Sequence, residues 1–370
     1  MKSINDDLFI HRIALTLIEG VGDVLARQLV SYCGGVEAIF REKRRVLEKI
    51  PEIGPKTALS ISGFRNFSVA EKELKFIRQH KIKTYFYLDE DYPARLKNCY
   101  DSPVMLYYKG TADLNHSRMV AIVGTRNASD YGKSFTLKLI DELEQMKAIV
   151  VSGLAYGIDI TAHKACVNKN LETIGVMAHG LDRIYPKIHN QTARKMVTCG
   201  GLLTEHISGS DPDRENFPKR NRIIAGLCDA VIVVEAAKKG GALITADIAN
   251  SYNRDVFALP GRIDDTYSEG CNMLIKSNRA ALIQSAADIR YIMGWENDNH
   301  TNKVKQKSLF VELNADEKKL VEFISANEKA AIDSIVIHSG MQPSKVAAIL
   351  LNLEFAGVIK GLPGKVFVLC

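Results

Sequence analysis

Five short runs of apolar, mostly β-branched residues constrain the fold of this 370-residue chain more than any other feature. None of them alternates apolar with polar residues, as is typical of strands buried on both faces of a parallel sheet. Stretches of helical periodicity lie between them, so the order is β-α-β. The middle block, residues 81–293, is therefore predicted to be a doubly wound α/β domain. The runs are residues 119–124, 148–153, 173–178, 229–236 and 255–260.

The block before it, residues 1–80, has the pattern of short helices with a short internal sequence repeat. Gly22 and Gly54 each precede a predicted helix, and Ala26 and Ala58 follow them at the same spacing. Helix-hairpin-helix elements use such turns to present free backbone N–H groups to a DNA phosphate. Two helical hairpins that merely pack together would give the same pattern, and the sequence does not decide between these interpretations.

The block after it begins with a predicted linker, residues 294–308, which has almost no apolar content from residue 297 on. Three helix-sized stretches and two short apolar runs around a Leu-Pro-Gly turn follow in residues 309–370, an order that predicts a winged-helix domain. Its candidate recognition helix, residues 344–355, contains one cation, Lys345. A helix that reads DNA should carry more, so we expect this domain to contact mainly protein.

Composition limits the classes of protein that remain. The formal net charge of +6 is too small for a histone-like polyelectrolyte, but it would attract an anion if concentrated on one surface. Seven scattered cysteines without C-x-x-C spacing argue against a disulfide framework and a structural zinc site. No stretch approaches the roughly 18 apolar residues of a membrane helix, and the start lacks a signal-peptide core. We expect a reduced, cytoplasmic protein without membrane contact, metal or cofactor.

Ligands of doubly wound sheets bind beyond the carboxyl ends of the strands, so the residues that follow the strands are the candidates for a site. Glycines at helix N-termini can hold anions, Arg and Lys can bind phosphates, and Phe217 and Asn221 can stack on or hydrogen-bond a base. The pattern suits a ligand with several phosphates and exposed bases. The candidates are Gly124, Thr125, Arg126, Ser152, Gly153, Phe217, Lys219, Arg220, Asn221, Arg222, Lys238, Lys239, Gly240 and Gly241.

A catalytic alternative exists within the same loops. Asp159 and His163, one helical turn apart, could form an acid–base pair. The better interpretation is that Asp159 favours a helix N-terminus and that His163 packs beneath the loop. We find no H-E-x-x-H, G-x-S-x-G, P-loop, complete G-x-G-x-x-G or magnesium-type carboxylate cluster. The residues therefore indicate anion binding without an evident catalytic group.

Six motifs, in this order and spacing, resemble the DNA-processing protein A family (DprA, also called Smf). They are VAIVGTRNASDYG, VVSGLAYGIDITAH, GLDRIYP, FPKRNRIIAGL, LITA and FALPG. The resemblance implies an extended Rossmann domain flanked by a sterile-alpha-motif-like helical domain and a winged helix. It also implies a non-enzymatic role, in which single-stranded DNA is bound and protected during natural transformation and the recombinase RecA is loaded onto it. The family dimerises through its Rossmann domain, which would place contacts within residues 243–289.

By motif position, the resemblance assigns to the DNA site Arg126, Ser152, Gly153, Phe217, Lys219, Arg220, Asn221 and Arg222. Three segments depart from the family's pattern, one of them at Asn278-Arg279, where Gly is usual. Tyr156 stands where many members have Arg, which exchanges a cation for a ring that can stack. Residues 240–242 are Gly-Gly-Ala in place of a common Ser-Gly-Ser, which removes two hydroxyl donors.

A rival hypothesis is a Rossmann-like hydrolase of nucleoside monophosphates. Arg126, Glu235 and the loop at Gly240 could bind a small nucleotide, but the P-G-G-x-G-T-x-x-E arrangement that such hydrolases resemble is missing. A third hypothesis, a purely structural scaffold, leaves the clustered cations unexplained.

Overall fold

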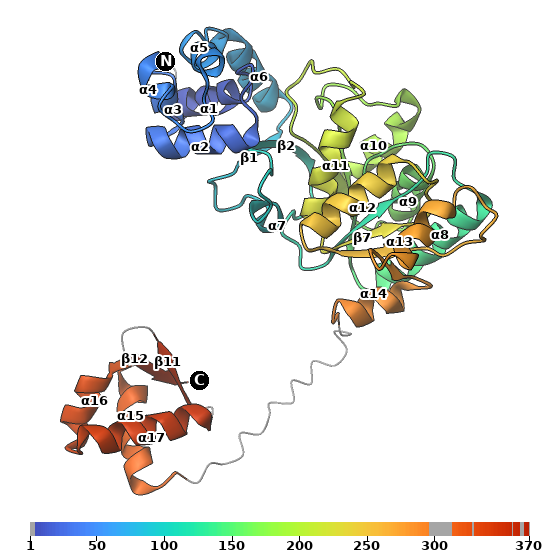
Figure 1. Ribbon diagram of the computed structural model, residues 1–370. Coiled ribbons are helices and arrows are strands. Elements are labelled where there is room, and N and C mark those ends of the chain that lie inside the picture. Colours follow the sequence, from blue (N-terminus) through green and yellow to red (C-terminus); the bar gives the residue numbers. More distant parts are fainter. Residues whose placement is uncertain (1–3, 296–312, 328, 357, 363–365, 370) are drawn as a thin grey trace. The chain divides into compact units, whose positions relative to one another are not determined.

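The structure is a computed structural model in which residues 4–295, 313–327, 329–356, 358–362 and 366–369 are described (Figure 1). The chain divides into two compact units, Met1–Trp295 and Glu296–Cys370. Apart from Gly294 and Trp295, the predicted linker lies outside the described residues.

The first unit is built on a nine-stranded sheet in the order β1-β2-β6-β5-β4-β3-β7-β8-β9. The seven strands from β6 to β9 are parallel, β2 pairs antiparallel with β6, and β1 pairs antiparallel with β2. All five apolar runs form strands of the parallel part, so the predicted α/β fold is confirmed. These strands are β3 (Met119–Val123), β4 (Ile149–Ser152), β5 (Thr173–Val176), β7 (Ala230–Val233) and β8 (Asp255–Ala258).

Four strands of this sheet were not predicted. They are β1 (Lys83–Phe86), β2 (Met105–Gly110), β6 (Gly200–Thr204) and β9 (Ala281–Leu282). The sequence signal of β6 is weak because it begins with Gly200 and Gly201, which have no side chain to show an apolar pattern. A Cβ on Gly201 would overlap the ring of Tyr108 in β2, so the close pairing of these two strands requires glycine there.

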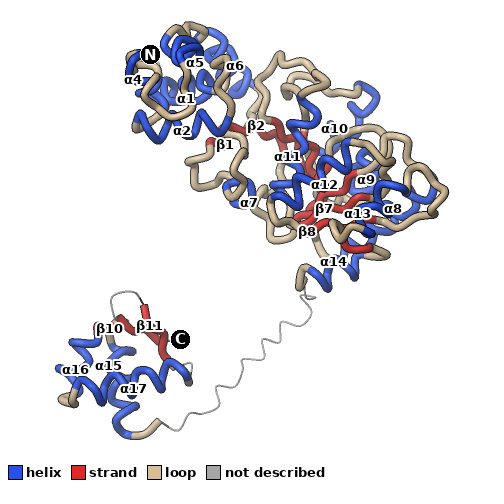
Figure 2. Tube along the Cα trace, in the orientation of Figure 1, coloured by secondary structure: helices blue, strands red, loops and turns tan. Residues whose placement is uncertain are grey.

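Helices cover both faces of the sheet (Figure 2). Val120 and Ile122 of β3 pack in one apolar cluster with α8, α9 and α14. Met119, Ala121 and Val123 point to the other face, into a cluster with α11, α12 and α13. The alternation explains why the strands are apolar throughout. The helices are α8 (Asp130–Gln145), α9 (Ile158–Asn168), α10 (Asn190–Met196), α11 (Asn216–Leu227), α12 (Gly241–Ser251), α13 (Glu269–Lys276) and α14 (Ala286–Ile292).

Residues 4–79 of the same unit are helical. Their apolar core continues into β1 and β2 through Phe86, Met105 and Tyr107. Gly22 and Gly54 are the N-cap residues of α2 and α5, so each glycine turn leads into a helix. The comparison of this block with sterile-alpha-motif and helix-hairpin-helix domains stays a prediction. The helices are α1 (Ile4–Leu15), α2 (Asp23–Cys33), α3 (Val36–Ile39), α4 (Arg44–Leu47), α5 (Pro55–Ser62) and α6 (Phe67–Gln79).

The described residues of the second unit form three helices and a small antiparallel sheet in the order β10-β12-β11, the arrangement of the predicted winged helix. Leu320, Ile335 and Leu350 are among the residues of its core. Lys345, the cation of the candidate recognition helix, forms an ion pair of 2.6 Å with Asp316. The elements are α15 (Ala315–Ala326), β10 (Ala330–Ala331), α16 (Ile332–Ser339), α17 (Pro343–Phe355), β11 (Ile359–Leu362) and β12 (Val366–Leu369).

Candidate nucleic-acid interface

The loops that follow β3, β4 and β7 are joined through their backbones. Thr125 N donates to Glu235 O at 2.7 Å, and Ile158 N donates to Thr125 O at 3.2 Å. Gly157 has φ +76°, and a Cβ there would overlap the carbonyl oxygen of Thr125. Only glycine fits such a conformation and such an approach. The predicted site residues of three separate strands are therefore held in one continuous framework at the carboxyl edge of the sheet.

Arg126 and Phe217 meet on this edge. The Arg126 guanidinium lies 5.8 Å from the centroid of the Phe217 ring, which stands in the first turn of α11. The Arg126 side chain is exposed and has no hydrogen-bond or ion-pair partner among the described residues. Tyr185, from the loop after β5, brings a second ring to 6.0 Å from Phe217. An uncompensated cation beside aromatic rings is the combination that binds phosphates and unpaired bases.

Arg220 lies beneath these groups and is 4% exposed. Its Nη1 donates to Gly153 O at 3.0 Å and also to Val176 O, so it fastens the ends of β4 and β5. Burial lowers the pKa of Arg220 to about 10, and the nearby Asp159 carboxylate opposes this shift. The charge of Arg126 adds to the lowering, so the two arginines share one neighbourhood. Contact between Arg220 and a phosphate stays a prediction, and its observed contacts are those of a structural group.

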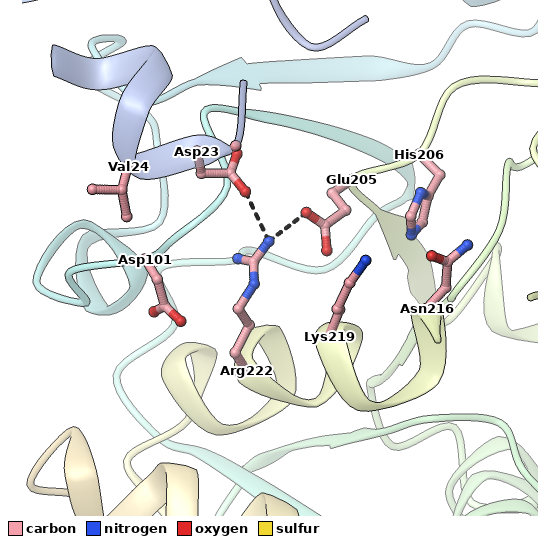
Figure 3. A pocket seen from close by; sticks show the side chains of 9 residues that line it. Asp23, Val24, Asp101, Glu205, His206, Asn216, Lys219 and Arg222 are labelled. Carbon is pink, nitrogen blue, oxygen red and sulfur yellow. Dashed lines mark hydrogen bonds and ion pairs between the residues drawn. The ribbon is translucent and has the colours of Figure 1, made fainter. Parts of the chain in front are cut away.

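Arg222 lines a separate pocket of about 330 Å³, formed by residues that include those of α2, α11 and the segment after β6 (Figure 3). Its Nη2 lies 3.0 Å from Asp23 Oδ2 and also pairs with Glu205. Two carboxylates thus compensate its charge. Lys219 lines the same pocket, with a long 4.0 Å ion pair to Glu215. The predicted basic run on α11 is therefore divided between two surfaces.

The polar side chains predicted for the site mostly serve the framework. The Ser152 hydroxyl is buried and donates to Ile122 O at 2.6 Å. Asn221, 8% exposed, donates to Gly241 O at 3.3 Å and so links α11 to the start of α12. Gly124 is half-buried, and a Cβ there would press on Ile158. Their contribution to ligand binding would come from position rather than from free donors.

The loop before α12 is the most open part of the predicted site. Lys238 and Lys239 are exposed, and Lys238 has only a 3.9 Å ion pair with Glu269. Gly240 is the N-cap of α12, without a side-chain cap, and Gly241 is exposed. An 11-residue helix with an uncapped N-terminus beside two lysines can attract a phosphate.

The groups invoked for catalysis are engaged elsewhere. Glu235, 1% exposed, accepts from Ser129 N at 2.9 Å and from Ser129 Oγ, and so holds the start of α8. Asp159 accepts from Gly153 N at 3.1 Å. His163 Nδ1 lies 2.7 Å from Thr173 Oγ1, and burial lowers the pKa of this histidine to about 3. These contacts support the packing interpretation of Asp159 and His163.

Other expectations concern metals, thiols and membranes. Within the described residues, no group of three or more His, Cys, Asp or Glu side chains could hold a metal ion. Six of the seven cysteines lie in the described part of the chain, and all six are free. No helix in that part is long and apolar enough to cross a membrane.

Fold and site together define a class: Rossmann-like proteins whose strand-end loops carry an open arginine and aromatic rings in place of a nucleotide-cofactor fingerprint. The family model of DNA recombination-mediator protein A matches residues 83–294, and that of the DprA winged helix domain matches residues 310–365. The chain belongs to the DNA recombination-mediator protein A family, also named DprA or Smf.

Relatives with solved structures and curated names agree. The chain is 34% identical to Protein Smf of Synechocystis sp. over 95% of its own length and 96% of the relative's. The X-ray structure of DprA from Streptococcus pneumoniae matches with a TM-score of 0.66 and 34% identity, over 79% of this chain and 98% of that one. A structure of Helicobacter pylori DprA, described for its single-stranded DNA binding mode, matches with a TM-score of 0.52 and 30% identity, over 58% and 95%.

Two features of the site were not predicted from the sequence. Tyr185 lies in the motif GLDRIYP, which follows a predicted strand, and strand-end position alone could have singled it out. Asp23, one of the two acids that compensate Arg222, gave no such signal, because it is 199 positions away in the sequence.

Proposed function

We propose that this protein binds single-stranded DNA at the carboxyl edge of its sheet and acts as a non-enzymatic, cytoplasmic recombination mediator. In natural transformation it would protect incoming DNA and load RecA onto it, as a homodimer formed through the Rossmann domain. The observation that carries the DNA-binding part is the exposed, uncompensated Arg126 guanidinium beside the Phe217 ring. The binding mode named for the Helicobacter pylori relative supports the same ligand.

The hydrolase alternative gains no support from the geometry. Its candidate carboxylate, Glu235, is buried and bound to Ser129 at the start of α8, where it would have to leave that helix to act on a ligand.

The DNA-binding part is tested by the salt dependence of affinity. Fluorescence anisotropy with a labelled oligothymidine at several salt concentrations gives both the affinity and the slope of its logarithm against log salt. Arg126→Ala should weaken binding and reduce the slope by about 0.7, the value for one lost phosphate contact on a single strand.

Lys138→Ala is the matched control. Lys138 is exposed on α8 and pairs with Glu142 at 3.8 Å. Its replacement by Ala removes the same formal charge as Arg126→Ala. Its affinity and slope should equal those of the unaltered protein. If Arg126→Ala also left both unchanged, the assigned site would be wrong.

The RecA part needs its own measurement. DNA-dependent ATP hydrolysis by RecA, on single strands already coated with a single-strand-binding protein, should begin sooner when this protein is added. An unchanged lag beside intact DNA binding would reject the loading role and leave the DNA-binding role standing.

A further inference from the structure

Two tyrosines in loops at the carboxyl edge of the sheet are large and exposed. Tyr156 follows β4 and Tyr185 follows β5, and each is 47% exposed. Neither hydroxyl has a hydrogen-bond partner among the described residues. Exposed aromatic rings on ordered loops are a signature of a binding surface, because they offer much contact area with little conformational freedom to lose.

Tyr185 contacts the Arg126–Phe217 pair directly, and Tyr156 is linked to it through the backbone. The Tyr185 and Phe217 rings lie 6.0 Å apart at an interplanar angle of 52°. Tyr156 directly precedes Gly157, whose backbone abuts the carbonyls of Thr125 and Arg126. Tyr156 is thus one residue from direct contact with the loop that carries the open arginine.

The loops that carry these rings are held firmly. The Tyr156 ring meets the His189 ring edge to face at 5.0 Å. His189 is 5% exposed, and its Nδ1 lies 2.8 Å from Leu154 O in the loop of Tyr156. Tyr185 and His189 belong to one short segment, so this segment touches Tyr156 at one end and Phe217 at the other. We call Tyr156, Tyr185 and Phe217 the three-ring surface.

We propose that Tyr156 and Tyr185 stack on bases of a nucleic acid strand whose phosphates lie along Arg126, and that the three-ring surface selects single strands over duplexes. This inference rests on the proposed function, of which it names the base-contacting residues. Stacking is tolerant of sequence because every base has a π-face. In a duplex those faces are covered by neighbouring base pairs, so the rings have nothing to stack on.

The test compares an oligothymidine with an abasic strand of equal length, which keeps the phosphates and lacks the bases. Tyr156→Ala and Tyr185→Ala should each lower affinity for oligothymidine by about 5- to 150-fold, the effect of removing one stacking ring. Affinity for the abasic strand and the salt slope should stay as in the unaltered protein. Tyr156→Phe and Tyr185→Phe keep the ring and should bind both strands normally.

A charge exchange gives a second, independent readout. Tyr156→Arg should tighten binding of the abasic strand and raise the salt slope by about 0.7, because a cation replaces a ring next to the phosphate path. Thermal unfolding of each variant confirms that the fold is retained.

The outcomes separate this inference from the function on which it rests. Alanine variants that bind oligothymidine normally, or that weaken equally on the abasic strand, would overturn the stacking role while single-strand binding stood. An unaltered protein that bound neither strand would overturn the proposed function and the inference with it.

Discussion

Arg222→Ala should lower the unfolding free energy of the first unit, because it leaves two largely buried carboxylates without the cation that compensates them. The side chains of Arg222, Glu205 and Asp23 are 13%, 14% and 24% exposed. Removing one partner of a buried ion pair costs about 3–5 kcal/mol, and the residual exposure of Asp23 favours the lower end, about 3 kcal/mol. Figure 3 shows both acids directed at the same guanidinium, so Arg222→Ala removes the ion-pair partner of both at once.

The loss should depend on pH. Burial raises the pKa of Glu205 to about 7, against the opposing effect of Arg222. A raised pKa means that the folded state holds the Glu205 proton more tightly than the unfolded state. The unfolding free energy that this proton contributes to the unaltered protein is therefore lost as pH rises from about 4.5 through 7. Without Arg222 the pKa rises further. The cost of Arg222→Ala should therefore be largest at about pH 8 and roughly half as large at about pH 5.5, where Glu205 is neutral.

Denaturant unfolding followed by Trp295 fluorescence and far-UV circular dichroism at the two pH values measures this. Lys219→Ala is the control: Lys219 is a cation on the same helix that is 64% exposed, and its loss should cost at most about 0.5 kcal/mol. Adding Glu205→Gln to Arg222→Ala should recover part of the loss and remove most of its pH dependence. Equal losses at both pH values would refute the reasoning. A DNA-binding salt slope lowered by about 0.7 would instead make Arg222 a phosphate contact.

Two further predictions concern the buried part of the framework. In Gly153→Ala, the new Cβ would overlap the Arg220 guanidinium. Thermal unfolding should therefore show that the unfolding free energy falls by about 1–3 kcal/mol, and DNA affinity should fall as well. An unchanged melting temperature would contradict this. Thr173 Oγ1 donates to Val150 O, so the neutral His163 donates from Nδ1 to this hydroxyl. Burial lowers the pKa of His163 to about 3, so the folded state binds this proton less tightly than the unfolded state. The unfolding free energy of the unaltered protein, relative to that of His163→Asn, should therefore fall by about 1.4 kcal/mol per pH unit below 6.5. Urea unfolding at about pH 7 and 5 would detect this fall.

The sheet was predictable where burial on both faces forces a continuous apolar run, as in β3 and β7. It was not predictable in β6, where glycines replace side chains to admit Tyr108. The two antiparallel strands β1 and β2 were missed for a different reason. They share an apolar core with the N-terminal helices, and the sequence pattern does not show this partnership.

The candidate site was predictable to the extent that position along a strand determines position in space. Arg126, predicted from the end of β3, and Phe217, predicted from the basic stretch at the start of α11, do meet. Which cations stay open to a ligand was not predictable, because compensation depends on acids brought together by the tertiary fold. A count of basic residues in the predicted site gives Arg220 and Arg222 of α11 the same weight as Arg126 of the loop after β3, although both α11 arginines are mostly buried and engaged.

The engaged arginines still bear on binding through rigidity. A flexible polyanion loses conformational freedom when bound, and a site whose own groups must also become ordered loses more affinity. Arg220 fastens the ends of β4 and β5, and Asn221 fastens α11 to α12, so the loops of Tyr156 and Phe217 start from fixed positions. A buried charge can therefore raise affinity by holding the open groups in place, whether or not it touches the ligand itself. On this argument, mutations in the framework should lower affinity without changing the salt slope, whereas loss of Arg126 should change both.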